Sequence, residues 1–240
     1  MELFAGHFVV VTGGGGGIGR AMCRAFAREG AAVWAVGRNA ERLKETVSDC
    51  GGRGRAYVAD LTDDAQVDTL GKDAAQDFGR VDILVHAAGT MLHGPVSDSP
   101  VEGLDAQFRS NVRVPYRVTQ RLLPLLRARA GQIVFVNSSI VFGSLRNNAG
   151  QYAATQHASK ALAEALRQEV NADGIRVLCI YPGRTATSLQ QRLYAKTATR
   201  YRPELLLQPE EIATMVVAAL SLPRTAEVTD INIRPMLKSY

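Results

Sequence analysis

A run of glycines near the start of the chain sets the strongest limit on its fold. Residues 12–19 read T-G-G-G-G-G-I-G and lie between the apolar run Phe8 to Val11 and an amphipathic segment that begins at Arg20. A β-branched run, a glycine turn and a helical segment in this order predict a strand-turn-helix that opens a phosphate-binding βαβ unit. Glycine allows the tight turn and lets an anion approach the free N–H groups at the start of the helix. This context favours dinucleotide binding over a merely flexible loop.

Length and hydropathy exclude several other classes of protein. With 240 residues and no linker-like segment, the chain is expected to form a single domain over 1–240. No apolar run approaches the roughly 20 residues that a membrane helix needs. The first residues do not read as a secretory signal. We therefore expect a cytoplasmic protein without membrane contact.

Cysteines and charges exclude two further kinds of site. Cys23, Cys50 and Cys179 lie far apart without C-x-x-C spacing, which argues against disulfides and against a zinc site. The net charge of +5 comes from scattered arginines, with no basic run that carries interleaved aromatics. We therefore expect no metal and no nucleic-acid partner, although a positive balance suits an anionic cofactor or substrate.

Strand and helix patterns alternate along the first half of the chain. Apolar strands are expected at 31–36, 55–60 and 81–86, and helices at 40–50 and 64–78, with Thr62 as the N-cap of the second helix. Together with the first strand and helix they make four βα units in succession. This order predicts an α/β fold with a parallel sheet, whose ligand would bind at the carboxyl ends of the strands.

The second half continues the alternation and adds one irregular segment. The pattern predicts helices over 101–127, from Tyr152 to about 171 and over 209–220, and strands over 132–136, 175–180 and 227–233. The polar segment 184–208 has no clear periodicity and is a candidate lid over the site.

A stripe of four arginines follows the expected helix 101–127, at positions 109, 113, 117 and 121. Like charges four residues apart on a helix repel each other by a few tenths of a kcal/mol. Two environments stay open for this stripe. It faces solvent, or it meets acidic residues of another subunit, for which Glu164 and Glu169 are candidates.

The end of the second strand bears on the choice of cofactor. Enzymes that use NAD usually carry Asp or Glu there to bind the ribose hydroxyls, whereas this strand ends Gly37-Arg38-Asn39. No carboxylate stands there to repel a 2′-phosphate, and the guanidinium of Arg38 can bind one. The sequence therefore favours NADP(H).

Further short motifs follow in a fixed order over nearly the whole chain. The glycine turn has the form T-G-x-x-x-G-x-G, with glycines at 13, 17 and 19. The other motifs are Asp60-Leu61, Ala87-Ala88-Gly89, Asn111, Ser139 thirteen residues before Tyr152, and Pro182-Gly183 with Thr187. In this combination the chain resembles the single-domain type of the short-chain dehydrogenase/reductase family. The resemblance implies a doubly wound α/β (Rossmann) fold with about seven parallel strands.

Two positions depart from that family's pattern. The family motif is Y-x-x-x-K, but four residues after Tyr152 the chain has Gln156. Lys160 is no substitute, because it lies eight residues beyond Tyr152, roughly 12 Å along a helix axis. His86 stands where the family usually has asparagine.

The resemblance also assigns roles to these residues. Tyr152 would protonate the alkoxide that hydride transfer to a carbonyl creates, Ser139 would hydrogen-bond the carbonyl oxygen, and Asn111 would support a water chain. Gln156 keeps the ability to bind the cofactor's ribose but supplies no positive charge. The implied cofactor contacts are Gly13, Gly17, Ile18, Gly19, Arg38, Asp60, Leu61, Ala88, Gly89, Tyr152, Gln156, Pro182, Gly183 and Thr187.

Without a neighbouring cation, Tyr152 is expected to titrate near the ordinary pKa of about 10 and to stay protonated at neutral pH. A protonated tyrosine suits reduction and hinders alcohol oxidation. The leading hypothesis is therefore an NADPH-dependent reductase of ketones or aldehydes on small molecules, weakened by Gln156. Two alternatives stay open: a cofactor-binding sensor or supporting subunit without catalysis, and a Gln156 that was introduced to trap a complex.

The family also implies an oligomer and a place for the substrate. Its members usually form dimers or tetramers through the helices that correspond to 101–127 and 152–171, so we expect a homodimer or homotetramer. The substrate cleft is expected beneath the segment 184–208 and beside Ile140, Val141, Leu145 and Arg146.

Overall fold

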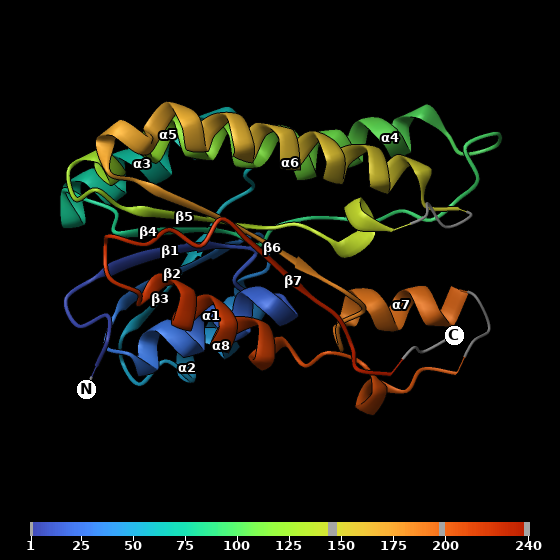
Figure 1. Ribbon diagram of the computed structural model, residues 1–240, viewed down its shortest axis with the longest axis horizontal. Helices are drawn as coiled ribbons and strands as arrows, with labels where there is room; N and C mark the ends of the chain where they lie inside the picture. Colours follow the sequence, from blue (N-terminus) through green and yellow to red (C-terminus); the bar gives the residue numbers. More distant parts are fainter. Residues whose placement is uncertain (1, 144–147, 197–199, 238–240) are drawn as a thin grey trace.

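One parallel sheet of seven strands forms the centre of the protein (Figure 1). The computed structural model describes residues 2–143, 148–196 and 200–237, without the side chain of Lys196. The strand order is β3-β2-β1-β4-β5-β6-β7. The strands are β1 (Phe8–Thr12), β2 (Ala32–Gly37), β3 (Gly54–Val58), β4 (Ile83–His86), β5 (Gln132–Val136), β6 (Arg176–Pro182) and β7 (Asp230–Ile233). The order reverses between β1 and β4, so the expected doubly wound fold is confirmed.

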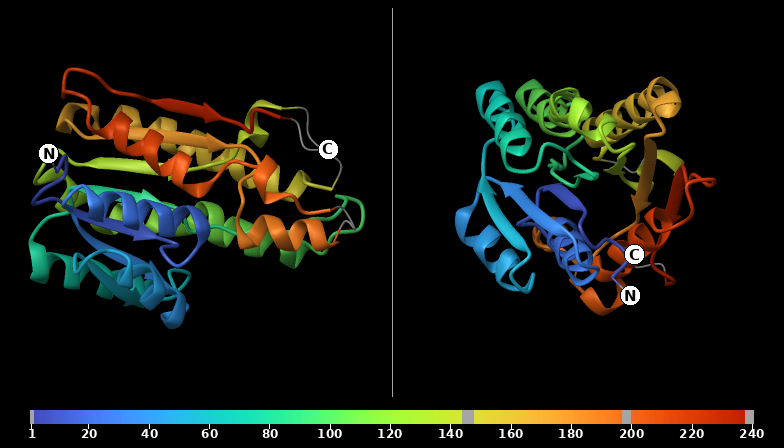
Figure 2. Two further views of the ribbon diagram at one scale, coloured as in Figure 1. Left: turned by 90° about the horizontal axis from the view of Figure 1, so that it is seen from below. Right: turned by 90° about the vertical axis from the view of Figure 1, so that its left-hand side faces the viewer.

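Helices cover both faces of this sheet. Figure 1 shows α3, α5 and α6 on one face and α1, α2 and α8 on the other, with α7 beyond the ends of the strands. Their bounds are α1 (Gly17–Arg28), α2 (Ala40–Ser48), α3 (Asp64–Phe78), α4 (Val101–Phe108), α5 (Val114–Arg127), α6 (Gly150–Val170), α7 (Ser188–Lys196) and α8 (Pro209–Leu220). Two apolar cores result, one on each face. The right-hand view in Figure 2 shows the sheet between its two layers of helices. Strands buried on both faces need continuous apolar runs, and this explains why β1 reads F-V-V-V-T.

The expected helix 101–127 is interrupted. Arg109–Arg113 form a π turn between α4 and α5. Residue 115 is a proline without an N–H, so it cannot donate the ordinary helical hydrogen bond to the carbonyl of Asn111. The turn accommodates one additional residue at this point, and it buries the side chain of Asn111.

Three of the four arginines of the stripe pair within their own chain, and the fourth, Arg109, is exposed to solvent. Arg113 pairs with Asp64 at 2.6 Å, and Arg117 and Arg121 pair with Asp68 at 2.8 and 3.4 Å. Both aspartates lie on α3 of the same chain, so these three arginines join the π turn and α5 to α3. Of the two acidic residues that were candidates for a partner subunit's side, Glu164 pairs with Lys160 of its own helix.

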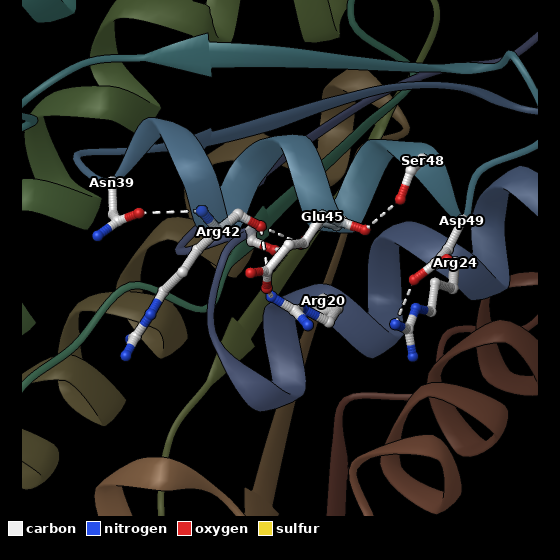
Figure 3. A network of polar contacts seen from close by, with 9 residues as sticks. Arg20, Arg24, Asn39, Arg42, Glu45, Ser48 and Asp49 are labelled. Carbon is white, nitrogen blue, oxygen red and sulfur yellow. Dashed lines mark hydrogen bonds and ion pairs between the residues drawn. The ribbon is translucent and has the colours of Figure 1, made fainter.

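Smaller differences concern caps and the lid segment. Asp63, not Thr62, caps α3, because its carboxylate accepts from the N–H of Ala65. Segment 184–208 contains the helix α7, and its two ends are joined where Thr185 pairs with Leu207. On the face of the sheet that α1 and α2 cover, ion pairs of Arg20 with Glu45 and of Arg24 with Asp49 join these two helices (Figure 3). Within the described parts of the chain, no helix is long and apolar enough to cross a membrane.

Candidate active site

The glycine turn is packed too closely for side chains. Gly13 has φ +68°, and a Cβ there would lie 2.7 Å from the carbonyl oxygen of Ala87. A Cβ on Gly19 would lie 2.2 Å from the carbonyl oxygen of Gly13. The helix α1 that follows has no side-chain cap and no acidic residue in its first turn. Its N–H groups and bare backbone therefore offer an anion a suitable place.

Arg38 and Asp60 lie close together at the ends of β2 and β3. Arg38 is exposed. The pKa of Asp60 is lowered, mainly because its carboxylate accepts hydrogen bonds from the N–H and the hydroxyl of Thr62, and in smaller part because of the charge on Arg38. Leu61 is buried in the core. Figure 3 shows a second arginine here, Arg42, whose guanidinium points away from the α1–α2 network.

Asn111 fixes the loop that follows β4. Its Oδ1 accepts from the N–H of Thr90 at 2.8 Å, and its Nδ2 donates to the carbonyl of Thr90 at 2.9 Å and to the hydroxyl of Thr155 at 3.0 Å. Thr155 lies on α6, one residue before Gln156. The asparagine therefore joins the loop that contains Gly89 to the helix that carries Tyr152.

The phenol of Tyr152 lies near the side chain of Ser138. Burial raises the pKa of Tyr152, and the Ser138 hydroxyl opposes this only in part, so the phenol stays protonated at neutral pH. Ser139 begins the short 3-10 turn Ser139–Phe142, which Ser138 caps by accepting from the N–H of Ile140.

A cavity of about 130 Å³ joins several of the expected site residues. Its lining includes Ile18, Ala88, Gly89, Asn111, Tyr152 and Gln156. Gln156 is buried, and its backbone carbonyl accepts from Asn137 at 3.0 Å. The carboxamide of Gln156 makes no hydrogen bond to any residue that the structure describes, so it is open to the cavity. The structure thus places Gln156 beside Tyr152, as the motif predicts.

Two polar residues of this cavity had no assigned role. His86 is 4% exposed, and burial lowers its pKa to about 3, so the imidazole is neutral. Its Nε2 lies 2.8 Å from the hydroxyl of Thr119, while Nδ1 has no partner in the described structure. Ser159 lies two turns beyond Tyr152 on the same face of α6. Only the departure of His86 from the family motif could have indicated its position.

The segment after β6 closes the glycine side of the site. The N–H of Gly183, directly after Pro182, donates to the carbonyl of Ile233 at 2.7 Å. Thr187 caps α7 and packs on the glycine turn, where a Cβ on Gly17 would lie 2.6 Å from its methyl group. Leu189, in the first turn of α7, lines the cavity.

The remaining expected residues are less informative. Ile140 and Val141 are partly buried in the 3-10 turn after Ser138, and Leu145 and Arg146 lie outside the described residues. A larger but shallow hollow of about 470 Å³ lies elsewhere, on the outer face of α4, the π turn and α6. Its lining includes none of the expected site residues, so the smaller cavity is the candidate active site.

Comparison with known proteins decides the family. The sequence profile of the short chain dehydrogenases matches residues 7–198. The chain belongs to the short-chain dehydrogenase/reductase family. An uncharacterised oxidoreductase of Staphylococcus epidermidis is 32% identical over 95% of this chain and 96% of its own length. A second one, from Staphylococcus aureus, is 30% identical over 98% of this chain and its full length.

Solved structures of short-chain dehydrogenases share the whole fold. One from Shigella flexneri, complexed with NADP, is 28% identical, with a TM-score of 0.87 over 96% of this chain and 98% of its own. An alcohol dehydrogenase from Thermococcus sibiricus, complexed with 5-hydroxy-NADP, is 25% identical, with a TM-score of 0.85 over 98% of both chains. The protein is thus an oxidoreductase of the short-chain dehydrogenase/reductase family.

Proposed function

We propose that the protein is an NADPH-dependent reductase of ketones or aldehydes on small organic molecules. The observation that carries this proposal is the cavity at which Tyr152 meets Gln156, together with the Ser138 hydroxyl, which lowers the pKa of Tyr152. Ser138 and Tyr152 together supply two hydroxyl groups for a carbonyl oxygen. The absence of a lysine at 156 leaves Tyr152 protonated, which is the state that a proton donor needs.

The residues present fit a dinucleotide that carries a 2′-phosphate. The glycine turn is packed too closely for side chains at Gly13 and Gly19, so its backbone stays bare, and the open start of α1 suits a pyrophosphate. Arg38 directly follows β2 and Arg42 lies in the first turn of α2, close to where a 2′-phosphate would lie. Relatives complexed with NADP and 5-hydroxy-NADP support the same choice. We therefore assign NADP(H), and when bound it would supply the hydride.

The chain's own groups then act on the carbonyl. The Ser138 hydroxyl donates to the carbonyl oxygen and polarises it, in the role that the sequence motif gave to Ser139. The Tyr152 hydroxyl gives its proton to the oxygen as negative charge develops there. The carboxamide of Gln156 accepts or donates hydrogen bonds at the ribose without shifting the tyrosine pKa downwards. Asn111 holds the loop around Thr90 in place, since its side-chain bonds are all within the protein.

The direct test compares the protein with its Gln156→Lys variant. NADPH consumption is followed on a panel of ketones, diketones and aldehydes, after NADPH binding has been confirmed for both proteins. We expect the native protein to turn over and the lysine to raise the rate by up to about 10²-fold, because a cation lowers the tyrosine pKa towards the working pH. Turnover only in the variant would contradict the proposal and favour a cofactor-binding sensor or supporting subunit.

Two neighbouring serines provide a matched pair for the catalytic assignment. Ser138→Ala removes the hydroxyl that lowers the pKa of Tyr152, so we expect kcat to fall by about 10²-fold or more. Ser139→Ala makes the same chemical change one residue away, and we expect a loss below about threefold. Equal losses would refute the assignment to Ser138.

We also propose that the protein is a homodimer or homotetramer that associates through α4, α5 and α6. Phe108 and Tyr116 border the shallow hollow on this outer face, with 37% and 51% of their surfaces exposed. Large exposed aromatics beside an apolar hollow are typical of interfaces. Tyr116→Lys should shift the protein to a smaller species in size-exclusion chromatography, and an unchanged elution volume would refute this face.

A further inference from the structure

The two positions at which the chain departs from the family motifs lie in one cavity. His86 ends β4 and Gln156 lies within α6, far apart in the sequence. Both line the cavity of about 130 Å³ that also contains Tyr152. His86 stands where asparagine is usual and Gln156 where lysine is usual. Because the two residues meet in one small cavity, the two departures are to be explained together.

The buried polar side chains that line this cavity fall into two groups. Asn111 and Asn137 use both their amide and their carbonyl groups in hydrogen bonds within the chain. Nδ1 of His86, the carboxamide of Gln156 and the hydroxyl of Ser159 have no hydrogen-bond partner among the described residues. A buried polar group without a partner costs about 1–3 kcal/mol. We therefore expect a common partner for these three groups inside the cavity.

The fold brings the three groups to the cavity from two sides. Gln156 and Ser159 are three residues apart on α6, so their side chains lie on one face of the helix. His86 lines the cavity from β4, and its ring packs on Phe135 with 4.8 Å between the ring centres. Its Nε2 lies 2.8 Å from the hydroxyl of Thr119. This contact leaves Nδ1 as the nitrogen that is available to a further partner.

The chemistry of the lining favours a water molecule as that partner. Among the described residues that line the cavity there is no Asp, Glu, Lys or Arg, and burial lowers the pKa of His86 to about 3, so the imidazole is neutral. An ion would find no opposite charge here. A buried water typically makes about three hydrogen bonds, and an imidazole, a carboxamide and a hydroxyl supply both donors and acceptors. A water takes up about 30 Å³ in the liquid, so the cavity has room for it.

We propose that a bound water molecule joins His86, Gln156 and Ser159, and that His86 and Ser159 thereby hold the carboxamide of Gln156 in position for the ribose of NADP(H). The proposal rests on the cofactor site and the reductase activity proposed above, and it adds two positioning residues to them. The three groups make no direct hydrogen bonds to one another, and a water bridges polar groups at such separations. A glutamine side chain that is already ordered loses less conformational entropy when it binds the cofactor.

The first test is the ¹⁵N NMR signal of the His86 ring in histidine-labelled protein without cofactor, identified by its loss in His86→Asn. Gln156→Met and Ser159→Ala each remove one partner of the water, so we expect the Nδ1 signal to shift in both. Gln168→Met makes the same change at an exposed position of α6 and should leave the signal where it is. An unchanged Nδ1 signal in all three variants would overturn the proposal, and so would a crystal structure without water density between the three groups.

NADPH affinity then shows whether the three groups act as one unit. Gln156→Met, Ser159→Ala and His86→Asn should each weaken binding about 3- to 10-fold, which is the contribution of about one hydrogen bond. Adding Ser159→Ala or His86→Asn to Gln156→Met should cost less than about twofold more, because both residues act through the carboxamide. Losses that multiply would refute the unit. If His86→Asn does not fold, the Ser159 pair of variants decides.

A matched control excludes a general effect of replacing a histidine. His157 is exposed and directly follows Gln156 on α6. His157→Asn makes the same chemical change as His86→Asn outside the cavity, so we expect NADPH affinity to change by less than about twofold. An equal loss in both histidine variants would refute the role of His86.

These measurements are separate from turnover. If NADPH binds but no carbonyl is reduced, the reductase function fails, whereas the NMR and affinity results still decide on the water-bridged unit. If NADPH does not bind, the proposed cofactor site fails and the NMR signal alone decides. If reduction is observed, Ser159→Ala should raise KM for NADPH about 3- to 10-fold and lower kcat by less than about threefold, because Tyr152 and Ser138 are unchanged. A loss confined to kcat would refute a positioning role for Ser159.

Discussion

Acid should weaken this protein through one buried histidine, because His86 cannot hold a proton where it lies. Burial lowers its pKa to about 3, whereas an unfolded histidine titrates near 6.5. Below pH 6.5 the unfolded state takes up a proton that the folded state refuses, so stability that is fully present above this pH is lost as the pH falls towards 3. Between pH 7.5 and pH 5 the loss from this one group is about 2 kcal/mol.

The measurement is the free energy of unfolding at both pH values, for the native protein and for His86→Asn. Asparagine is the usual residue of the family at this position and does not titrate. The exposed histidines remain in both proteins, so their effects cancel in the comparison. We expect the native protein to lose about 2 kcal/mol more than the variant, equivalent to about 4–8 °C in Tm for a chain of this size. If the two proteins lose stability in parallel, His86 is protonated in the folded state and our account of its burial is wrong.

Three further predictions concern the cofactor site and the helix layer. Arg38→Ala should weaken NADPH binding about 10- to 100-fold while NADH binding changes little, as measured by nucleotide fluorescence; an equal loss for both would exclude a 2′-phosphate contact. Gly19→Ala should weaken NADPH binding at least about tenfold, because its Cβ would displace Gly13, and unchanged affinity would show that the turn adapts. Arg117→Gln breaks a half-exposed ion pair with Asp68, so urea unfolding should show a cost below about 1 kcal/mol, and a shift in oligomer size would contradict the pairing within the chain.

The fold follows from the sequence because buried parallel strands must be apolar throughout. The apolar runs that form β1, β2 and β4 are compatible with little other than a strand buried on both faces. The glycine turn identifies the strand that directly precedes the cofactor's pyrophosphate. Elements whose residues are polar were harder to predict. The helix α7 was expected to be irregular because it has few apolar positions. Its Leu189 lines the cavity, and its Tyr194 contacts Arg184 and Tyr201 of the lid segment.

The serine assignment shows where a motif stops being informative. Ser138 and Ser139 are adjacent and chemically identical, and the interval to Tyr152 depends on the length of the loop between them. A loop can gain one residue without changing the strand or the helix that it joins. Only the direction of the two side chains at the end of β5 distinguishes them, and direction depends on the strand register, which a count of residues does not contain.

The π turn was predictable in one respect and hidden in another. Pro115 lacks the N–H that would bond the carbonyl of Asn111, so a break near this point could have been inferred. The partners of the arginine stripe could not have been inferred from the sequence, because they depend on how α5 is rotated against α3. Residues such as Asp64 and Asp68 reach the arginines only in the rotation that the π turn sets.

This turn also means that α4 and α5 are out of phase. Each residue of an α-helix advances the direction of its side chain by about 100°, so removing one residue from 109–113 would turn all of α5 by that angle relative to α4. Val118 and Leu122 would leave the core, and the arginines would point elsewhere than at α3. A chimera that takes these two helices from different relatives therefore keeps its core only if the junction brings its additional residue with it.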